Sequence, residues 1–388
     1  MQLTEVQDKA GENIFLQVPV LLHRNDPNYI RPLDKDVTDV FDPQKNKAFR
    51  SGKVCRWILY DDQGHPAGRI AAFVNTKYKN KGDQVPTGCI GFFECINNAD
   101  AAALLFDRAK AWLAENGMQA MDGPVNFGER DRWWGLVVKG FGEPLYAMNY
   151  NPPYYVELFE QYGFRIFYRQ LCFSMEPLKP LSEKIHQRHA ALSADPDFHS
   201  EHFRKKDLEK FAADFTTVYN KAWAGHGGNK QMPLEQARLL FKKMLPVLDE
   251  RIIYFAYHRN EPIAMFVNLP DLNEWFRHLN GRFDLVHKIL FLLIRRFKHN
   301  RKCTGLAFGI VPEFQGKGVD AYIVGEAAKF MQSNKSPYTS YEMQWIGEFN
   351  PKMVNIAKNL GESYSSRELA TYRYFFDRSI PVTPHPQL

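Results

Sequence analysis

Residues 307–330 read AFGIVPEFQGKGVDAYIVGEAAKF, and this stretch decides how the fold is interpreted. Its apolar beginning predicts a strand over 305–311, and its end predicts a helix over 321–331. The segment between them, QGKGVD, contains two glycines and a lysine. A glycine-rich turn between a strand and a helix N-terminus directs backbone N–H groups and the helix dipole at an anion. The stretch therefore predicts a phosphate-binding loop.

The loop matches neither of the two common nucleotide-binding motifs, because the spacings GxxxxGK[ST] and GxGxxG are both absent. It resembles the acyl-CoA binding motif of the GCN5-related N-acetyltransferase (GNAT) superfamily, Gln/Arg-x-x-Gly-x-Gly/Ala, which follows a strand often ending in Val-x-Pro. Val311, Gln315 and Gly318 fit this pattern, whereas Asp320 stands where Gly or Ala is usual. The alternative is an ordinary strand–turn–helix connection.

The resemblance implies a set of acyl-CoA contacts. The backbone of Ile310 and Val311 is expected to bind the pantetheine arm and to polarise the thioester carbonyl. Asn350 matches the residue that begins the helix on the CoA side. Acetyl-CoA or a longer acyl-CoA is then the cofactor-like substrate, and no metal is expected. The residues expected to cradle the diphosphate are Gln315, Gly316, Lys317, Gly318 and Val319.

Size and composition favour two domains and a reducing compartment. The chain has 388 residues, a net charge of +6 and five cysteines without paired spacing. Neither a signal peptide nor an apolar run of about 20 residues is visible. We therefore expect a cytoplasmic protein. The weak basicity does not indicate a nucleic-acid partner.

The two halves of the sequence follow the same order of hairpin, strand, helix, strand, helix and final strand. The last helix starts at Asn151 in the first half and at Asn350 in the second, and each ends at a glycine. This repeat predicts two α+β (mixed α/β) units, 1–178 and 179–388, each with a mostly antiparallel sheet flanked by helices. Where the loop should recur in the first half, the sequence FFECINNAD lacks glycine and lysine. The first unit is therefore expected to be degenerate in the CoA loop.

Several further motifs resemble a family of bacterial proteins with two GNAT-like units, and the resemblance covers nearly the whole chain. They are GPVN at 123–126, YNPPYY at 150–155, LPDLN at 269–273 and WIGEFN at 345–350. The family implies transfer of an acyl group from a CoA thioester to a primary amine. Some related bacterial acyltransferases are thought to use long-chain amines such as sphingoid bases.

Residues 13–22, NIFLQVPVLL, are predicted to form the first strand.

Acyl transfer needs a base for the amine and a hydrogen-bond donor for the oxyanion or thiolate. Many GNAT enzymes place a Tyr acid about seven residues after the helix-starting Asn, but Ala357 stands there. Tyr341, Tyr364 or a water remain as replacements. The candidate bases are Glu342, Glu348 and His226. Each also has a structural interpretation. Glu342 could lie on a solvated strand face, Glu348 could cap a helix, and His226 could be an ordinary surface histidine.

An insertion at 270–304 contains LVHKILFLLIRRFKHNRK over 285–302. At 100° per residue this segment forms an apolar face and a basic face, spoiled by Phe291 and two arginines. Such a helix either lies in an anionic membrane surface or packs on the body with its basic face in solvent. The membrane alternative favours a lipid amine as the acceptor.

Two other functions remain open on the sequence alone. One is a Fem-type aminoacyl transferase, which also duplicates the GNAT unit and uses aminoacyl-tRNA. The other is a non-catalytic acyl-CoA-binding protein, because Asp320 and Ala357 depart from the family pattern. The acceptor, the acyl chain length and the oligomeric state stay undetermined, as does any ligand site in the first half.

Overall fold

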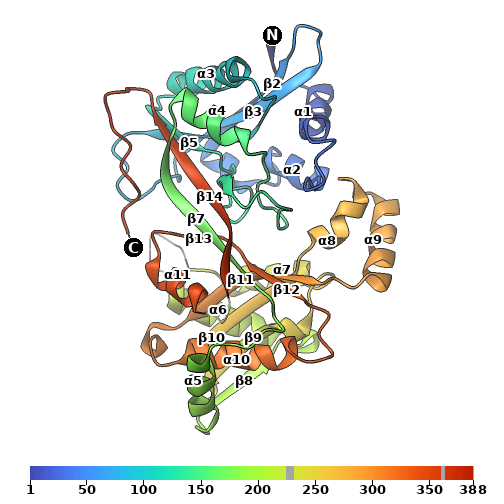
Figure 1. Cartoon of the computed structure of the whole chain (residues 1–388), viewed down its shortest axis with the longest axis vertical. Helices are drawn as coiled ribbons and strands as arrows, with labels where there is room; N and C mark the ends of the chain where they lie inside the picture. Colours follow the sequence, from blue (N-terminus) through green and yellow to red (C-terminus); the bar gives the residue numbers. More distant parts are fainter. Residues whose placement is uncertain (224–230, 360–362, 388) are drawn as a thin grey trace.

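The computed structural model describes residues 1–223, 231–359 and 363–387. Their strands form one sheet in the order β1-β2-β3-β4-β5-β14-β7-β12-β11-β10-β9-β8, with β13 beside β7 and β6 beside β14. Figure 1 shows the first half of the chain at the top of the molecule and the second half at the bottom, with α8 and α9 projecting at one side between them.

The first half contains seven strands and four α-helices among the described residues. The strands are β1 (Gln2–Glu5), β2 (Gly52–Tyr60), β3 (Pro66–Asn75), β4 (Thr87–Cys95), β5 (Ala120–Gly123), β6 (Leu136–Lys139) and β7 (Arg165–Met175). The helices are α1 (Lys9–Leu22), α2 (Asp34–Val40), α3 (Ala99–Glu115) and α4 (Tyr154–Tyr162).

The described part of the second half contains seven strands and seven α-helices. The strands are β8 (Phe198–His202), β9 (Ile253–His258), β10 (Glu261–Pro270), β11 (Lys302–Ile310), β12 (Ser340–Met343), β13 (Ile346–Gly347) and β14 (Tyr364–Phe375). The helices are α5 (Glu183–Ser193), α6 (Leu208–Trp223), α7 (Leu234–Met244), α8 (Asn273–Phe276), α9 (Leu285–Phe297), α10 (Val319–Met331) and α11 (Pro351–Lys358).

Both halves repeat the same arrangement of strands. In each, an antiparallel hairpin continues into a third strand, β4 or β11, and a helix then leads to a short parallel neighbour, β5 or β12. Most of the other pairs are antiparallel. Glycines in the left-handed region end α3 and α4, as their sequences predict, since Gly117 has φ 78° and Gly163 has φ 111°. The predicted mixed α/β fold with a repeated unit is confirmed.

The final strand of the chain belongs spatially to the first half. β14 runs antiparallel between β5 and β7, as the red strand of Figure 1 shows. Arg373 on β14 makes two 2.7 Å hydrogen bonds to the carboxylate of Asp122 on β5, and its guanidinium also binds Asp83 at 2.7 Å. Arg373 and Asp122 are 3% and 0% exposed. This buried pairing fixes the end of the chain to the first half.

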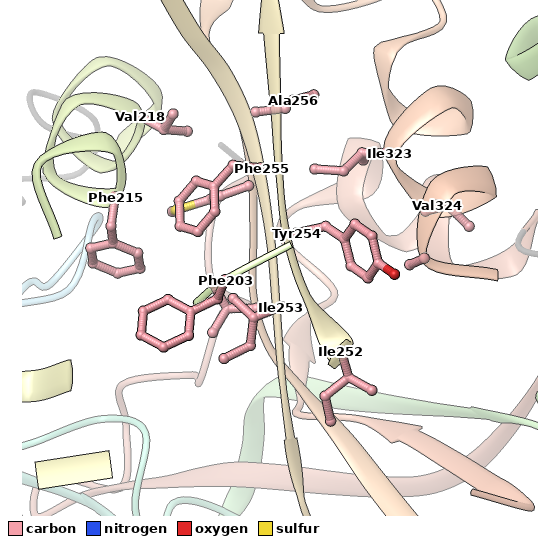
Figure 2. Packing of buried hydrophobic residues seen from close by; sticks show 14 of the residues in the cluster. Phe203, Phe215, Val218, Ile252, Ile253, Tyr254, Phe255, Ala256, Ile323 and Val324 are labelled. Atoms are coloured by element: carbon pink, nitrogen blue, oxygen red, sulfur yellow. The ribbon is translucent and has the colours of Figure 1, made fainter. Parts of the chain in front are cut away.

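The core of the second half surrounds β9. Successive side chains of a strand point to opposite faces, and Figure 2 shows Phe255 beside α6, with Phe215 and Val218, while Tyr254 points toward α10 and Ile323. All five belong to one buried hydrophobic cluster. Helices α6 and α10 therefore cover the two faces of the sheet, and this packing holds α10 in place behind its preceding loop.

The strand predicted at 13–22 is wrong, because these residues lie in helix α1. The buried side chains Phe15, Val18 and Pro19 have the i, i+3, i+4 spacing of a helix face. Asp8 caps the helix by accepting a 2.7 Å hydrogen bond from the Gly11 N–H. The β-branched and apolar composition favoured a strand, but the cap and the packing on β3 determine a helix.

Candidate functional site

A split between β11 and β12 forms the centre of the candidate site. The two strands pair in parallel only from Lys302↔Ser340 to Gly305↔Met343. The register between β10 and β11 shifts at Leu306, so this residue forms a bulge. Beyond it, residues 307–310 keep β10 as a neighbour but pair with no other strand in the described part of the chain. Apart from the Ile310 carbonyl, which accepts a hydrogen bond from Gln315, the backbone N–H and C=O groups on that edge are available to an extended ligand.

The glycine loop follows the open edge of β11. Gly316 and Gly318 have φ values of 74° and 85°, which are left-handed conformations that favour glycine. Gln315 holds the loop to the strand, because its Nε2 donates to the carbonyl of Ile310 at 3.1 Å. Gly318 is the N-cap of α10 and has no side chain to satisfy the first N–H groups of that helix. A helix N-terminus without a side-chain cap is the geometry that anion binding requires, and the role of this loop in holding the diphosphate stays a prediction.

Two cations lie beside this helix terminus. Lys317 is exposed within the loop, with its Nζ 5.4 Å from the ring centroid of Phe314. Arg188 on α5 is the second cation, since a Cβ built on Gly318 would lie 3.6 Å from the Arg188 Cβ. Arg188 gave no signal in the sequence, because it lies 130 residues before the loop and is brought there by the packing of α5 on α10. Asp320 occupies the first turn of α10, where its charge stabilises the helix dipole.

A tyrosine hydroxyl lies at the closed end of the split. A Cβ built on Gly305 would be 2.2 Å from the Tyr341 hydroxyl, so glycine is required for this close approach. The hydroxyl donates to Asn268 Oδ1 at 3.1 Å, and Tyr341 is 5% exposed. Burial raises the pKa of Tyr341 well above its ordinary value, so the hydroxyl remains a donor at neutral pH. Tyr364, the other tyrosine considered, is 59% exposed at the start of β14.

Glu342 lies opposite Thr304 and is one of the residues that close the split. It is 4% exposed and its carboxylate is heavily engaged. Lys302 Nζ lies 2.8 Å from Oε2, Arg367 Nε lies 3.7 Å from Oε1, and the Ser366 hydroxyl donates to Oε1 at 3.2 Å. Glu342 is thus in the vicinity of the split but is held in a buried ion pair.

The other expected residues have different surroundings. Glu348 is exposed, and its Oε1 accepts the Arg169 backbone N–H at 2.7 Å, which fixes it to β7. Asn350 is the N-cap of α11, where its side chain accepts the Met353 N–H at 3.2 Å. Ala357 is fully buried on that helix. His226 lies outside the described residues. The roles of these residues stay predictions.

The first half contains a cavity of about 70 Å³ that the sequence did not reveal. Its wall includes Arg69, Glu94 and Tyr155, which are 5%, 8% and 1% exposed. These side chains come from three separate elements, so no local motif indicates the site. Among the described residues, no group of three or more His, Cys, Asp or Glu side chains is placed to hold a metal ion.

Comparisons with known proteins agree with this geometry. No protein-family model matches the sequence. The chain is 24% identical over 383 residues to the bacterial ceramide synthase of Caulobacter vibrioides, covering 97% of each chain. It is 23% identical over 371 residues to the protein YghO of Escherichia coli, covering 91% of this chain and 90% of that one.

Two solved structures of GCN5-related N-acetyltransferases superimpose over nearly the full length of this chain. A tandem GNAT protein from the clavulanic acid biosynthesis pathway aligns with a TM-score of 0.55 at 10% identity, covering 98% of this chain and all of the other. A GCN5-related N-acetyltransferase from Sphaerobacter thermophilus aligns with a TM-score of 0.50 at 9% identity, covering 100% and 98%. The chain has the fold of the GCN5-related N-acetyltransferases, built twice in tandem.

Proposed function

We propose that the protein is an acyl-CoA-dependent N-acyltransferase that moves an acyl group from a CoA thioester to a primary amine. The observation that carries this proposal is the open edge of β11, which leads directly into the glycine loop at the N-terminus of α10. The loop provides an anion site, and the strand edge provides backbone partners for an extended amide-containing arm. Four residues separate the bulge from Ile310, or about 13 Å of strand.

We place the acyl-transfer reaction at the closed end of the split, where β11 and β12 still pair. The amine nitrogen attacks the thioester carbonyl carbon, the C–S bond breaks, and the thiolate leaves as CoA. We assign the Tyr341 hydroxyl, which donates to Asn268 Oδ1 in this structure, to donate instead to the developing negative charge during the reaction. The amine proton passes to a base, and Glu342, Glu348 and His226 stay the candidates for it. Glu342 directly follows Tyr341 on β12, so its side chain points to the opposite face of the sheet and is held there by Lys302.

Calorimetric titration with acetyl-CoA and palmitoyl-CoA tests the acyl-CoA site. We expect Lys317→Ala to weaken binding of either ligand by about three- to tenfold, because an exposed charge contact contributes roughly 1 kcal/mol. Lys335→Ala is the matched control, because Lys335 is also exposed but lies after the end of α10. Equal affinities for the two variants, or no binding of either ligand to the unmodified protein, would contradict the proposal.

A lipid amine is the acceptor class that we propose, with the protein binding at a membrane surface through α9. Most apolar side chains of α9 are exposed in the structure, whereas Phe291 is buried against α8 and Ile294 is half-buried beside it. Basic residues, including Lys288, Arg295 and Lys298, accompany this apolar face and complement anionic lipid head groups. The similarity to a protein named bacterial ceramide synthase supports the same class of acceptor, since a ceramide is an N-acylated lipid amine.

None of the described helices is long and apolar enough to span a membrane. The proposed contact is therefore a helix lying in the interface. Comparing palmitoyl-CoA with acetyl-CoA in the titration also tests this part, because a lipid-modifying enzyme is expected to bind the longer chain more tightly. Equal affinity for both thioesters would favour small amines as acceptors.

A further inference from the structure

The first half keeps the split of the GNAT unit although it lacks the glycine loop. Strands β4 and β5 pair only from Thr87↔Ala120 to Cys89↔Asp122, followed by one hydrogen bond from the Val125 N–H to the Ile90 carbonyl. A register shift against β3 places an extra residue in β4. Phe92 within this bulge has φ 51°, an unusual value for an aromatic residue. The 70 Å³ cavity lies at this split.

The polar end of the cavity is built from buried charged side chains. Glu94 accepts hydrogen bonds from the Tyr155 hydroxyl at 2.9 Å and from Arg69 at 3.4 Å, and His23 Nε2 lies 2.8 Å from the same carboxylate. Burial alone raises the pKa of Glu94, but the interactions with His23 and then Arg69 hold it below its ordinary value. The carboxylate is therefore ionised at neutral pH and retains acceptor capacity beyond these three partners.

Two buried donors at this end have no hydrogen-bond partner. The Tyr29 hydroxyl and the Arg69 Nε are both buried and unsatisfied. The Tyr29 ring packs 5.0 Å from the His23 ring, and both Tyr29 and Arg69 line the cavity. An unsatisfied buried donor costs roughly 1–3 kcal/mol, and each such group calls for an explanation. A ligand oxygen that accepts from Tyr29 satisfies one of them.

The remaining wall is mostly apolar and extends to helix α8, which precedes α9. Trp133 and Met148 form part of the wall together with Asn273 of α8. Helix α8 packs in turn on α9, with the rings of Phe276 and Phe291 5.6 Å apart. Trp345, two residues after β12, packs against the clusters that contain Trp133 and Met148. The cavity is thus bordered by α8 of the insertion, and part of its wall is backed by Trp345, which follows the split between β11 and β12.

We propose that this cavity binds the hydroxyl-bearing head group of an amphiphilic amine. The ligand hydroxyl accepts a hydrogen bond from Tyr29 and donates one to Glu94, while the alkyl chain leaves along the apolar wall toward α8 and α9. The identification of this amphiphile with the acyl acceptor rests on the proposed function. Binding in the cavity does not depend on acyl transfer and can be measured in the absence of acyl-CoA.

The test is calorimetric titration with 2-aminooctane-1,3-diol, with n-octylamine as a probe of equal chain length that lacks hydroxyls. We expect the aminodiol to bind at least tenfold more tightly than octylamine. Tyr29→Phe removes only the unpartnered hydroxyl and is expected to lower the affinity for the aminodiol about tenfold, because one hydrogen bond to a buried donor is lost. Tyr60→Phe, on β2 and outside the cavity wall, is expected to leave the affinity unchanged.

Thermal unfolding of Tyr29→Phe gives a second readout. Because the hydroxyl is buried without a partner, its removal is expected to keep or raise the Tm, so weaker binding cannot be assigned to misfolding. Equal affinity of the aminodiol for the Tyr29→Phe and unmodified proteins overturns the cavity assignment. Absence of aminodiol binding together with intact acyl-CoA binding also overturns it and leaves the proposed function standing. Binding of the aminodiol without binding of acyl-CoA supports the cavity and contradicts the proposed function.

Discussion

Removing the apolar ends of α9 should release the protein from membranes. Leu285 and Phe297 are 74% and 77% exposed, so their side chains contribute little to the folded core and are available to lipid. Fully burying a side chain of this size is worth about 1.5–3 kcal/mol, and three quarters of that is roughly 1–2 kcal/mol each. The double variant Leu285→Ser/Phe297→Ser is therefore expected to lose about 2–4 kcal/mol of membrane affinity, or roughly 30- to 1,000-fold in partitioning.

Flotation on vesicles that contain phosphatidylserine, at low salt, measures this loss. The matched control is Leu178→Ser/Leu239→Ser, which changes two apolar residues that are 58% and 54% exposed away from α9. The control should float like the unmodified protein, and neither variant should lower the Tm appreciably. Binding should also weaken at high salt, since basic residues near an anionic surface contribute about 1 kcal/mol each. Equal flotation of both double variants would refute the assignment of α9 as the membrane contact.

Three further predictions concern the sites and the joint between the halves. Tyr341→Phe should lower kcat about ten- to hundredfold with acyl-CoA affinity unchanged; a parallel loss in calorimetric affinity would assign the hydroxyl to binding. Asp271 is 2% exposed, and burial, opposed by Lys302 and the Tyr146 N–H, raises its pKa to about 6. Because the folded state binds this proton more tightly than the unfolded state, stability should fall by about 2 kcal/mol as the pH rises from 4 to 7. In Asp271→Asn, urea unfolding at the same pH values should lack this fall, and an identical pH profile would disprove the assignment. Arg373→Met leaves the Asp122 carboxylate buried without its cation and should destabilise the protein by about 3–5 kcal/mol in urea unfolding; a loss below 1 kcal/mol would contradict it.

The sequence allowed the local features of the second half to be predicted, because they depend on neighbouring residues. The loop glycines Gly316 and Gly318 have the left-handed conformations that their position suggested, and α10 begins two residues before its predicted start. A helix over 285–302 was also predicted, and α9 occupies 285–297 of that segment. The exposure of its apolar face was not predicted. Phe291, which seemed to spoil the amphipathic pattern, is the residue of α9 that is buried and anchors the helix to the body.

Features that depend on distant parts of the chain could not be read from the pattern. The ion pair of Glu342 with Arg367 joins β12 to β14 across the sheet, and nothing near Glu342 in the sequence indicates it. The cavity in the first half likewise combines Tyr29, Arg69 and Glu94 from separate elements. Helix α1 was mistaken for a strand because apolar alternation and helical spacing overlap in a short segment.

The position of β14 has a consequence for the biogenesis of the protein. During synthesis the first half leaves the ribosome well before residues 364–375 are made. Until then, the edges of β5 and β7 that pair with β14 have unpaired backbone N–H and C=O groups. A fragment that stops at residue 178 keeps both edges open permanently and is expected to aggregate. Loss of the last two dozen residues similarly removes the strand that joins the halves. The sheet of the first half is thus closed only after residues 364–375 have been synthesised.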